Sequence, residues 1–366
     1  MQAPIQVLNL KRMFDAHLHL RRGGMLLNVL PFTTRYCSRA VIMGNTLPPI
    51  KNAEGVIDYR KEILAGSTYF EPIMSIMLLK STTPEIVEEA YRAGARVLKL
   101  IPGGTSTNSD EGVPLSKLRD YYNVLDKAQE LGMIFSVHFE LSVNENGEEI
   151  PEIQREQWSI DYLFQIARDF LGLRIVVEHV STMEMIEIVK GLSDNVFATL
   201  TVHHATRNYF QCSEVDGMII NPINYCKPIF KRIPDMMAVA EAMVSGNPKF
   251  FLGSDSAPHL LSKKCYRLDI NQKPAAGLFT APVVPSVLCD IFVGHFYSIL
   301  HDHPDPEAFI AERINDFASN FGADAYGLSR TDITFMMVRS PWVVPREFAG
   351  VGLFMGGEEK QWQIRN

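Results

Sequence analysis

The sequence contains no uninterrupted apolar run of the roughly 20 residues that a membrane-spanning helix needs. Its first residues do not combine a charged start, an apolar core and a small-residue cleavage site, as a secretory signal would. It also lacks a basic cluster, because 35 Lys and Arg residues are outnumbered by 42 Asp and Glu residues, for a formal net charge of -7. Nucleic-acid-binding proteins usually carry such a cluster. We therefore expect a cytoplasmic protein with neither a membrane nor a nucleic acid as its partner.

Cysteine is also scarce. The five cysteines are scattered and show no CxxC spacing: Cys37, Cys212, Cys226, Cys265 and Cys289. Their odd number and wide spacing argue against a disulfide framework and against a zinc-thiolate knuckle. The sequence lacks a GxGxxG motif after its first apolar run, which counts against an open, doubly wound dinucleotide-binding sheet. We expect reduced thiols in a cytosolic compartment.

The chain alternates apolar, strand-like runs with amphipathic, helix-like stretches. Strands are expected over residues 14–21, 39–45, 72–79, 95–100, 134–138, 174–179, 195–201 and 249–255. Helices are expected over residues 53–64, 83–94, 115–131, 158–170 and 234–244, and one more is expected to open at the capping-box spacing of Ser181 and Glu184. Eight strands that mostly precede helices indicate parallel β/α units, and these close most economically into an α/β fold of the (β/α)8 TIM-barrel type.

The domain organisation follows from this pattern. With 46% hydrophobic residues, the 366-residue chain can bury one large core. We expect a single domain over residues 1–366, with the barrel over about 13–282. Residues 283–366 should form a C-terminal extension of extra helices and a tail rich in Val, Phe and Trp, which packs across one end of the barrel.

The stretch from Phe14 to Arg21 carries the first functional signal. Its residues alternate, so that Asp15, His17, His19 and Arg21 share one side of an extended strand. The two imidazoles then lie about 6 to 7 Å apart along the backbone, close enough to hold one metal ion. Taken alone, a His-x-His pair is more typical of a half-buried strand with a polar outer face.

The ends of the other expected strands strengthen the signal, because barrel active sites are built from the C-terminal ends of the strands. The polar residues at these ends are His17, His19, Asn45, Lys99, His138, His179, Asp255 and, shortly after it, His259. Each could be structural, as a capped imidazole, a lysine reaching solvent or an aspartate capping a helix. Their conjunction favours a functional site. His295, His301 and His303 receive no role.

The donor types indicate which metals would bind. Neutral imidazoles with one carboxylate suit Zn2+ or another borderline divalent ion, whereas Ca2+ and Mg2+ prefer oxygen ligands. Four histidines and one aspartate exceed the roughly three protein ligands of one catalytic zinc ion, so two ions fit better. The ammonium of Lys99 would be repelled by two dications. A carbamate formed with CO2 on Lys99 (N6-carboxylysine) would instead supply two bridging oxygens.

Several motifs together resemble a known family. They are His17-Leu-His19-Leu-Arg21, Lys99-Leu-Ile-Pro102, His138, Glu178-His179, residues 225–232 (YCKPIFKR) and residues 253–259 (GSDSAPH). The chain resembles the dihydroorotases of the amidohydrolase superfamily, and in particular the short bacterial type, from about residue 17 to residue 282. The resemblance implies that His17, His19 and Asp255 hold one metal ion and His138 and His179 the other. Carbamylated Lys99 would bind both, with a bridging hydroxide between them.

The same resemblance implies an activity on a small molecule. The expected reaction is the reversible cyclisation of N-carbamoyl-L-aspartate to (S)-dihydroorotate and water, the third step of pyrimidine (UMP) synthesis. Asp255 would be the catalytic residue, carrying a proton between the nucleophile and the amide nitrogen. The expected cofactors are two divalent metal ions, preferably Zn2+, and a homodimer is left open.

The resemblance also assigns substrate-binding roles, with Arg21 pairing with the substrate carboxylate. The substrate-binding residues would be Arg21, Asn45, Ser106, Thr107, Lys227, His259 and Ala276, with Lys227 and Ala276 contributing backbone groups. Ser106 and Thr107 lie on a loop that would close over the substrate. Lys227 stands where many relatives have an apolar residue. Read without the family, Arg21, Asn45 and His259 could equally be ordinary surface or loop residues.

Two other functions remain open from the sequence. A cyclic amidohydrolase of hydantoinase or allantoinase type would use the same metals but would not need an arginine at position 21. A non-catalytic relative that acts as an assembly partner would typically have lost metal ligands, and this sequence retains all of them.

Overall fold

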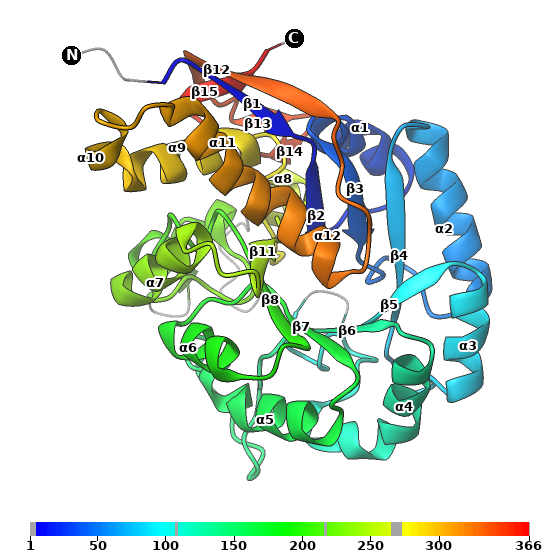
Figure 1. The fold of residues 1–366 in the computed structure, drawn as a ribbon. Helices are drawn as coiled ribbons and strands as arrows, with labels where there is room; N and C mark the ends of the chain where they lie inside the picture. The colour runs from blue at the N-terminus through cyan, green and yellow to red at the C-terminus, as the bar shows by residue number, and fades with distance from the viewer. Residues whose placement is uncertain (1–4, 107–108, 216–217, 265–272, 366) are drawn as a thin grey trace.

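A barrel of eight parallel strands forms the centre of the computed structural model, which describes residues 5–106, 109–215, 218–264 and 273–365. Its strands are β2 (Met13–Leu18), β3 (Cys37–Ile42), β4 (Glu71–Met77), β5 (Ala95–Leu100), β6 (Ile134–Val137), β7 (Arg174–Val177), β8 (Val196–Leu200) and β11 (Phe250–Leu252), paired in chain order (Figure 1). The remaining seam is bridged just beyond the strands, where the amide of Asp255 donates to the carbonyl of His17 over 2.9 Å. The expected TIM-type barrel is confirmed.

Helices surround this barrel, as Figure 1 shows. They are α1 (Gly23–Thr34), α2 (Ala53–Gly66), α3 (Pro84–Arg92), α4 (Tyr122–Glu130), α5 (Ile160–Asp169), α6 (Met183–Gly191) and α7 (Ile233–Val244), with 3-10 turns η1 (Leu115–Tyr121), η2 (Gln157–Ser159), η3 (Tyr209–Gln211) and η4 (Pro222–Asn224). The sequence did not predict α1, which holds Pro31 in its interior. The expected cap of α6 was also wrong. Thr182, not Ser181, caps this helix: its hydroxyl accepts a hydrogen bond from the amide of Met185 over 3.3 Å.

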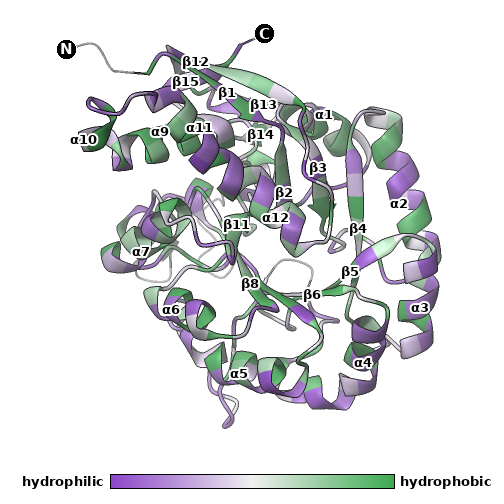
Figure 2. Cartoon of the chain, in the orientation of Figure 1, coloured by the Kyte–Doolittle hydropathy of each residue, from purple (hydrophilic) through white to green (hydrophobic). Residues whose placement is uncertain are grey.

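An apolar plug fills the end of the barrel opposite the functional residues. Side chains from successive strands meet there in a buried cluster: Phe14, Ala16, Val41, Met43, Ile73, Val97, Ile134, Val176, Phe251, Ala325 and Tyr326. Strands of parallel barrels are covered on both faces, which explains their nearly continuous hydrophobic character (Figure 2). Burial of this cluster leaves only the other end of the barrel available for polar chemistry.

The C-terminal extension differs from the prediction. The extension contains helices α9 (Val284–His295), α10 (Tyr297–Leu300), α11 (Pro306–Asn315) and α12 (Phe321–Ala325). A π-helical turn, Asp316–Asn320, connects α11 to α12. Beyond them, β12 (Thr334–Val343) pairs with both β15 (Glu359–Ile364) and the N-terminal strand β1 (Val7–Lys11) in a three-stranded antiparallel sheet (Figure 1). The expectation of a helical extension was therefore wrong beyond Ala325, because a partner strand from the opposite end of the chain completes this sheet.

The short elements complete the description. They are β9 (Glu214–Val215), β10 (Met218–Ile219), α8 (Leu261–Lys264), β13 (Glu347–Phe348) and β14 (Val351–Gly352). Among the described residues, no helix combines the length and the apolar character needed to cross a bilayer.

Candidate metal centre

A small cavity that is partly open to solvent lies at the C-terminal end of the barrel strands. Its lining includes these predicted site residues: His17, His19, Arg21, Asn45, Lys99, Ser106, His138, His179, Lys227, Asp255 and Ala276. His259 does not line it but lies behind Arg21, and Thr107 falls outside the described residues. The strand-end prediction therefore brought together residues that are up to 238 positions apart in the sequence, as His17 and Asp255 are.

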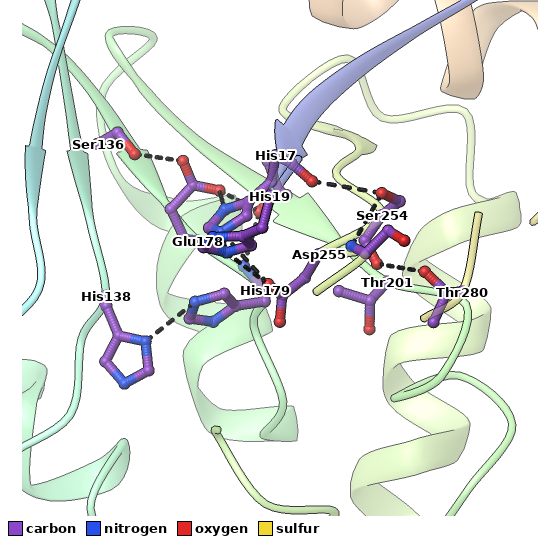
Figure 3. A network of polar contacts seen from close by, with 12 residues as sticks. His17, His19, Ser136, His138, Glu178, His179, Thr201, Ser254, Asp255 and Thr280 are labelled. Carbon is purple, nitrogen blue, oxygen red and sulfur yellow. Dashed lines mark hydrogen bonds and ion pairs between the residues drawn. The ribbon is translucent and has the colours of Figure 1, made fainter. Parts of the chain in front are cut away.

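The first ligand trio is His17, His19 and Asp255, which converge on one point (Figure 3). The Nε2 atoms of His17 and His19 lie 3.1 Å apart. The Oδ1 atom of Asp255 lies 3.4 Å from Nε2 of His17 and 3.1 Å from Nε2 of His19. Donors bound to one zinc ion at about 2.0 to 2.2 Å lie at similar separations from one another. The trio therefore fits a single divalent ion.

The second candidate pair of ligands is His138 and His179. Nδ1 of His138 lies 3.0 Å from Nε2 of His179, and Nε2 of His138 contacts the buried carboxylate of Glu140 over 2.8 Å. A hydrogen on Nε2 that is donated to Glu140 leaves a lone pair on Nδ1, directed at His179. Such a carboxylate commonly fixes the tautomer of a metal-binding histidine.

Glu178 plays the corresponding part for His17. Its Oε2 atom lies 2.7 Å from Nδ1 of His17 and accepts a hydrogen bond of 2.6 Å from Thr199, while Ser136 donates to Oε1 (Figure 3). Burial alone would raise the pKa of Glu178, but the nearby charges of His17 and Lys99 lower it to about 2. The resulting carboxylate holds the hydrogen of His17 on Nδ1 and leaves Nε2 free to bind a metal.

The other imidazoles are also held in their metal-binding form. Burial lowers the pKa of His19 to about 4, and it lowers the pKa values of His138 and His179 below their ordinary range. Metal ions bind the neutral ring, so near neutral pH these groups need not lose a proton first. The structure thus supplies neutral nitrogen donors for a metal ion.

Lys99 lies near the end of β5, lines the same cavity and is fully buried. Its Nζ atom has no hydrogen-bond partner among the described atoms. Burial lowers the pKa of Lys99 to about 8. On the order of a tenth of the side chain is then the neutral amine at pH 7, the form that reacts with CO2. This environment suits a carbamylated lysine better than a buried ammonium ion.

Three cavity residues have left-handed backbone conformations. The φ angles of Arg21, His179 and Asp255 are 59°, 40° and 44°. Residues other than glycine rarely adopt this conformation, and such strain tends to occur at functional sites. At Arg21 the conformation is supported by the hydroxyl of buried Tyr59, which donates to the Arg21 carbonyl over 2.6 Å.

The guanidinium of Arg21 is anchored beside the ligand groups. Its Nε donates to the carbonyl of Pro258 over 3.0 Å, and its Nη2 lies 2.9 Å from Nε2 of His259. The same His259 nitrogen lies 2.9 Å from the carbonyl of Ala276, and one nitrogen cannot accept from Arg21 and donate to Ala276 at once. Burial lowers the pKa of Arg21 to about 10, so the group remains a cation at neutral pH. Arg21 is thus a fixed cation in the cavity, and its neighbour His259 can either accept a hydrogen bond from Arg21 or donate one to the Ala276 carbonyl.

Lys227 also lines the cavity, but its ammonium is already neutralised. It pairs with the carboxylate of Glu152, which also accepts from the Tyr225 hydroxyl over 2.9 Å. This pairing explains how a lysine is accommodated in the cavity lining. It also leaves Arg21 as the cation better placed to bind a substrate anion.

Two buried histidines that were not predicted as site residues, His203 and His204, follow β8. They stand three and four residues beyond the strand end, so extending the strand-end search by one turn would have found them. No role was predicted for Glu140 either, although the His138-x-Glu140 spacing was visible in the sequence.

This barrel and its two converging ligand groups define a metal-dependent amidohydrolase. The sequence is 36% identical to the dihydroorotase of Vibrio vulnificus over 368 aligned positions, which cover 98% of this chain and 99% of that protein. The crystal structure of Saccharomyces cerevisiae dihydroorotase in complex with 5-fluoroorotic acid superposes with a TM-score of 0.86 at 27% identity, covering 99% of each chain. The chain belongs to the dihydroorotase family.

More distant structures share only the fold. L-hydantoinase from Arthrobacter aurescens superposes with a TM-score of 0.75 at 12% identity, over 97% of this chain and 82% of that one. A search against protein-family models found no match.

Proposed function

We propose that this chain interconverts N-carbamoyl-L-aspartate and dihydroorotate at a binuclear metal centre. Membership of the dihydroorotase family supports the reaction. The observation that carries the proposal is that Arg21 and both ligand groups line one cavity. A fixed cation beside metal-binding donors suits a substrate with both a carboxylate and a reacting carbonyl.

The ligand assignment follows from which donors converge. His17, His19 and Asp255 would hold one ion, and His138 and His179 the other, with carbamylated Lys99 contributing to both. The donor set of imidazoles and carboxylates favours Zn2+. When bound, such a pair of ions acidifies a water molecule and polarises the substrate carbonyl.

The remaining groups position the substrate and move protons. Arg21 would pair with the substrate carboxylate, while Asn45, Ser106 and His259 would supply neutral hydrogen-bonding groups. The backbone groups at Lys227 and Ala276 would complete the substrate-binding site. Asp255 would accept a proton on Oδ1 or Oδ2 and return it to the departing amide nitrogen, in the direction of ring opening.

Substrate comparison tests the proposal against its main alternative. The protein with its metal content measured should be assayed with dihydroorotate, hydantoin and allantoin under the same conditions. We expect at least two metal ions per chain and turnover of dihydroorotate well above that of the other two. Preference for hydantoin or allantoin would assign the chain a different cyclic amide, and the absence of all three activities in the metallated protein would favour a non-catalytic role.

Arg21→Met should sharply reduce activity while leaving the metal content normal. Loss of one partner of a desolvated, charged hydrogen-bonded pair costs about 2 to 5 kcal/mol, or roughly 30- to 5,000-fold in kcat/KM. Arg22→Met is the matched control, because Arg22 pairs with Glu62, 2.8 Å away, and does not line the cavity. Near-normal kinetics in Arg21→Met would contradict the carboxylate-binding role and favour a neutral substrate.

Lys264→Met tests whether the backbone at the cavity rim must be held in place. The buried Nζ atom of Lys264 donates to the carbonyls of Tyr225, Ala275 and Gly277 over 2.7, 3.0 and 2.8 Å, and so joins the two segments that contain Lys227 and Ala276. Hydrogen bonds to charged groups contribute about 1.5 to 3 kcal/mol each. We expect KM to rise about tenfold or more with a much smaller change in kcat. Lys263→Met, an exposed neighbour, is the control, and an unchanged KM in Lys264→Met would contradict this role.

A further inference from the structure

A second cluster of metal-binding side chains lies outside the centre described above. His203 and His204 follow β8, and Cys226 follows the short helix η4. One donor atom of each lies within 4.8 Å of the other two, and their exposures are 0%, 2% and 1%. In the described part of the chain, the first ligand trio of the metal centre is the other group that meets this condition.

His203 is the member of this cluster that lacks a structural explanation. Neither of its ring nitrogens has a hydrogen-bond partner among the described atoms, although the side chain is completely buried. An unpaired buried polar atom costs about 1 to 3 kcal/mol, and such atoms in native proteins are usually satisfied by a water molecule or an ion. The rings of Phe230 and Phe354 lie beside His203, with centroids 6.2 and 6.1 Å from the centroid of its ring, and supply no hydrogen-bonding atom to it.

The three donors suit a borderline metal ion. Two imidazoles and a thiolate are typical zinc ligands, with bond lengths that place the donor atoms about 3.3 to 3.6 Å apart. The donor atoms of the cluster lie within 4.8 Å of one another, so coordination would draw them together by at most about 1.5 Å. Burial lowers the pKa of His204 to about 4, so its ring is neutral near pH 7 and can act as a metal ligand.

The hydrogen bonds of the cluster are compatible with coordination. His204 contacts the Thr201 hydroxyl over 2.9 Å with Nδ1 and the Pro228 carbonyl over 3.0 Å with Nε2. If one nitrogen binds an ion, the other keeps a partner that orients the ring. The Cys226 thiol donates to the same Pro228 carbonyl over 3.2 Å. Binding would release the thiol proton to solvent as the bond from sulfur to the metal forms.

We propose that His203, His204 and Cys226 form a structural metal site for Zn2+ or a similar borderline ion. The bound ion would join the loop after β8 to the segment that contains Cys226 and Lys227. Lys227, which directly follows Cys226, lines the cavity of the metal centre. The site does not depend on the proposed reaction, since none of its three ligands belongs to the catalytic centre.

Cobalt substitution tests this site by spectroscopy. The protein is loaded with Co2+ and desalted, after which cobalt per chain and near-ultraviolet absorption are measured. A thiolate bound to Co2+ gives a charge-transfer band, and the proposed catalytic ligands include no sulfur. We expect this band in the wild-type protein, together with one more cobalt ion per chain than in Cys226→Ser, which should lack the band.

Two further variants complete the experiment. His203→Gln should bind the additional cobalt ion at least tenfold more weakly, and this variant decides the question if Cys226→Ser does not fold. Cys289→Ser, which alters another fully buried thiol in α9, should retain the band and the additional ion. A wild-type protein without the band, or a band that survives in Cys226→Ser, would overturn the proposal and leave His203 to a water molecule.

Discussion

Lys99→Ala should lose metal and activity together. If the carbamate on Lys99 contributes oxygens to both ions, its removal weakens the binding of both ions at once. Four histidines and one aspartate are then left to hold two dications. Metal ions contribute several kcal/mol to such reactions, so activity should fall by about a thousandfold or more. Metal analysis and dihydroorotate turnover measure the two effects on the same sample.

Chemical rescue separates the role of the carbamate from a packing defect. The alanine variant leaves a space where the Lys99 side chain lay, and a small carboxylic acid can enter it and supply the missing oxygens. Lys99→Met is the matched control, because it also removes the amine but fills most of the space. We expect acetate or propionate to restore part of the metal content and activity of Lys99→Ala and to have little effect on Lys99→Met. An active, fully metallated wild-type protein with an unmodified Lys99 would contradict the bridging role.

The barrel was predictable because each β/α unit is specified locally. Apolar runs, caps such as Thr83 and closing glycines such as Gly94 mark each unit within a few residues of its boundaries. The antiparallel sheet of β1, β12 and β15 was not predictable in the same way. Val7 pairs with Val338, so the partner that makes residues 334–364 a sheet lies at the opposite end of the chain. Helix α1 was missed because Pro31 and the glycines at its start oppose a helix locally, whereas tertiary packing of Leu26 and Leu30 favours it.

The cavity was predictable because one rule applies to every strand of a parallel barrel. Each strand delivers its last residues to the same end, so His17, Lys99, His138 and His179 could be grouped without knowing the strand order. The supporting contacts could not be inferred in this way. Which carboxylate fixes which imidazole depends on side-chain directions across different strands, as in the pairing of Glu178 with His17. The cluster of His203, His204 and Cys226 could not be predicted for the same reason, because Cys226 comes from a different loop.

Asp255→Asn should abolish most activity in both directions while retaining much of the metal. Burial alone would raise the pKa of Asp255, but its hydrogen bond with His19 and the charges of His17 and His19 hold that pKa well below the usual range. The native side chain is therefore an ionised base at neutral pH. Asparagine keeps the shape and one oxygen ligand but cannot accept the proton. General acid–base catalysis typically contributes about 10² to 10⁴ in rate, which sets the expected loss.

The pH dependence of the reaction rates of the native protein should reflect the same proton transfer through Asp255. Ring opening requires the base form, so its rate should fall as the pH drops and Asp255 and the nucleophilic water become protonated as a coupled pair. Ring closure starts from a protonated group, so its rate should fall on the alkaline side instead. Asp255→Ala, which also removes the oxygen ligand, should lose metal as well as activity and so serves as the control for Asp255→Asn. If the asparagine variant binds both metals and remains substantially active in either direction, Asp255 is a ligand alone and the proton moves through another group.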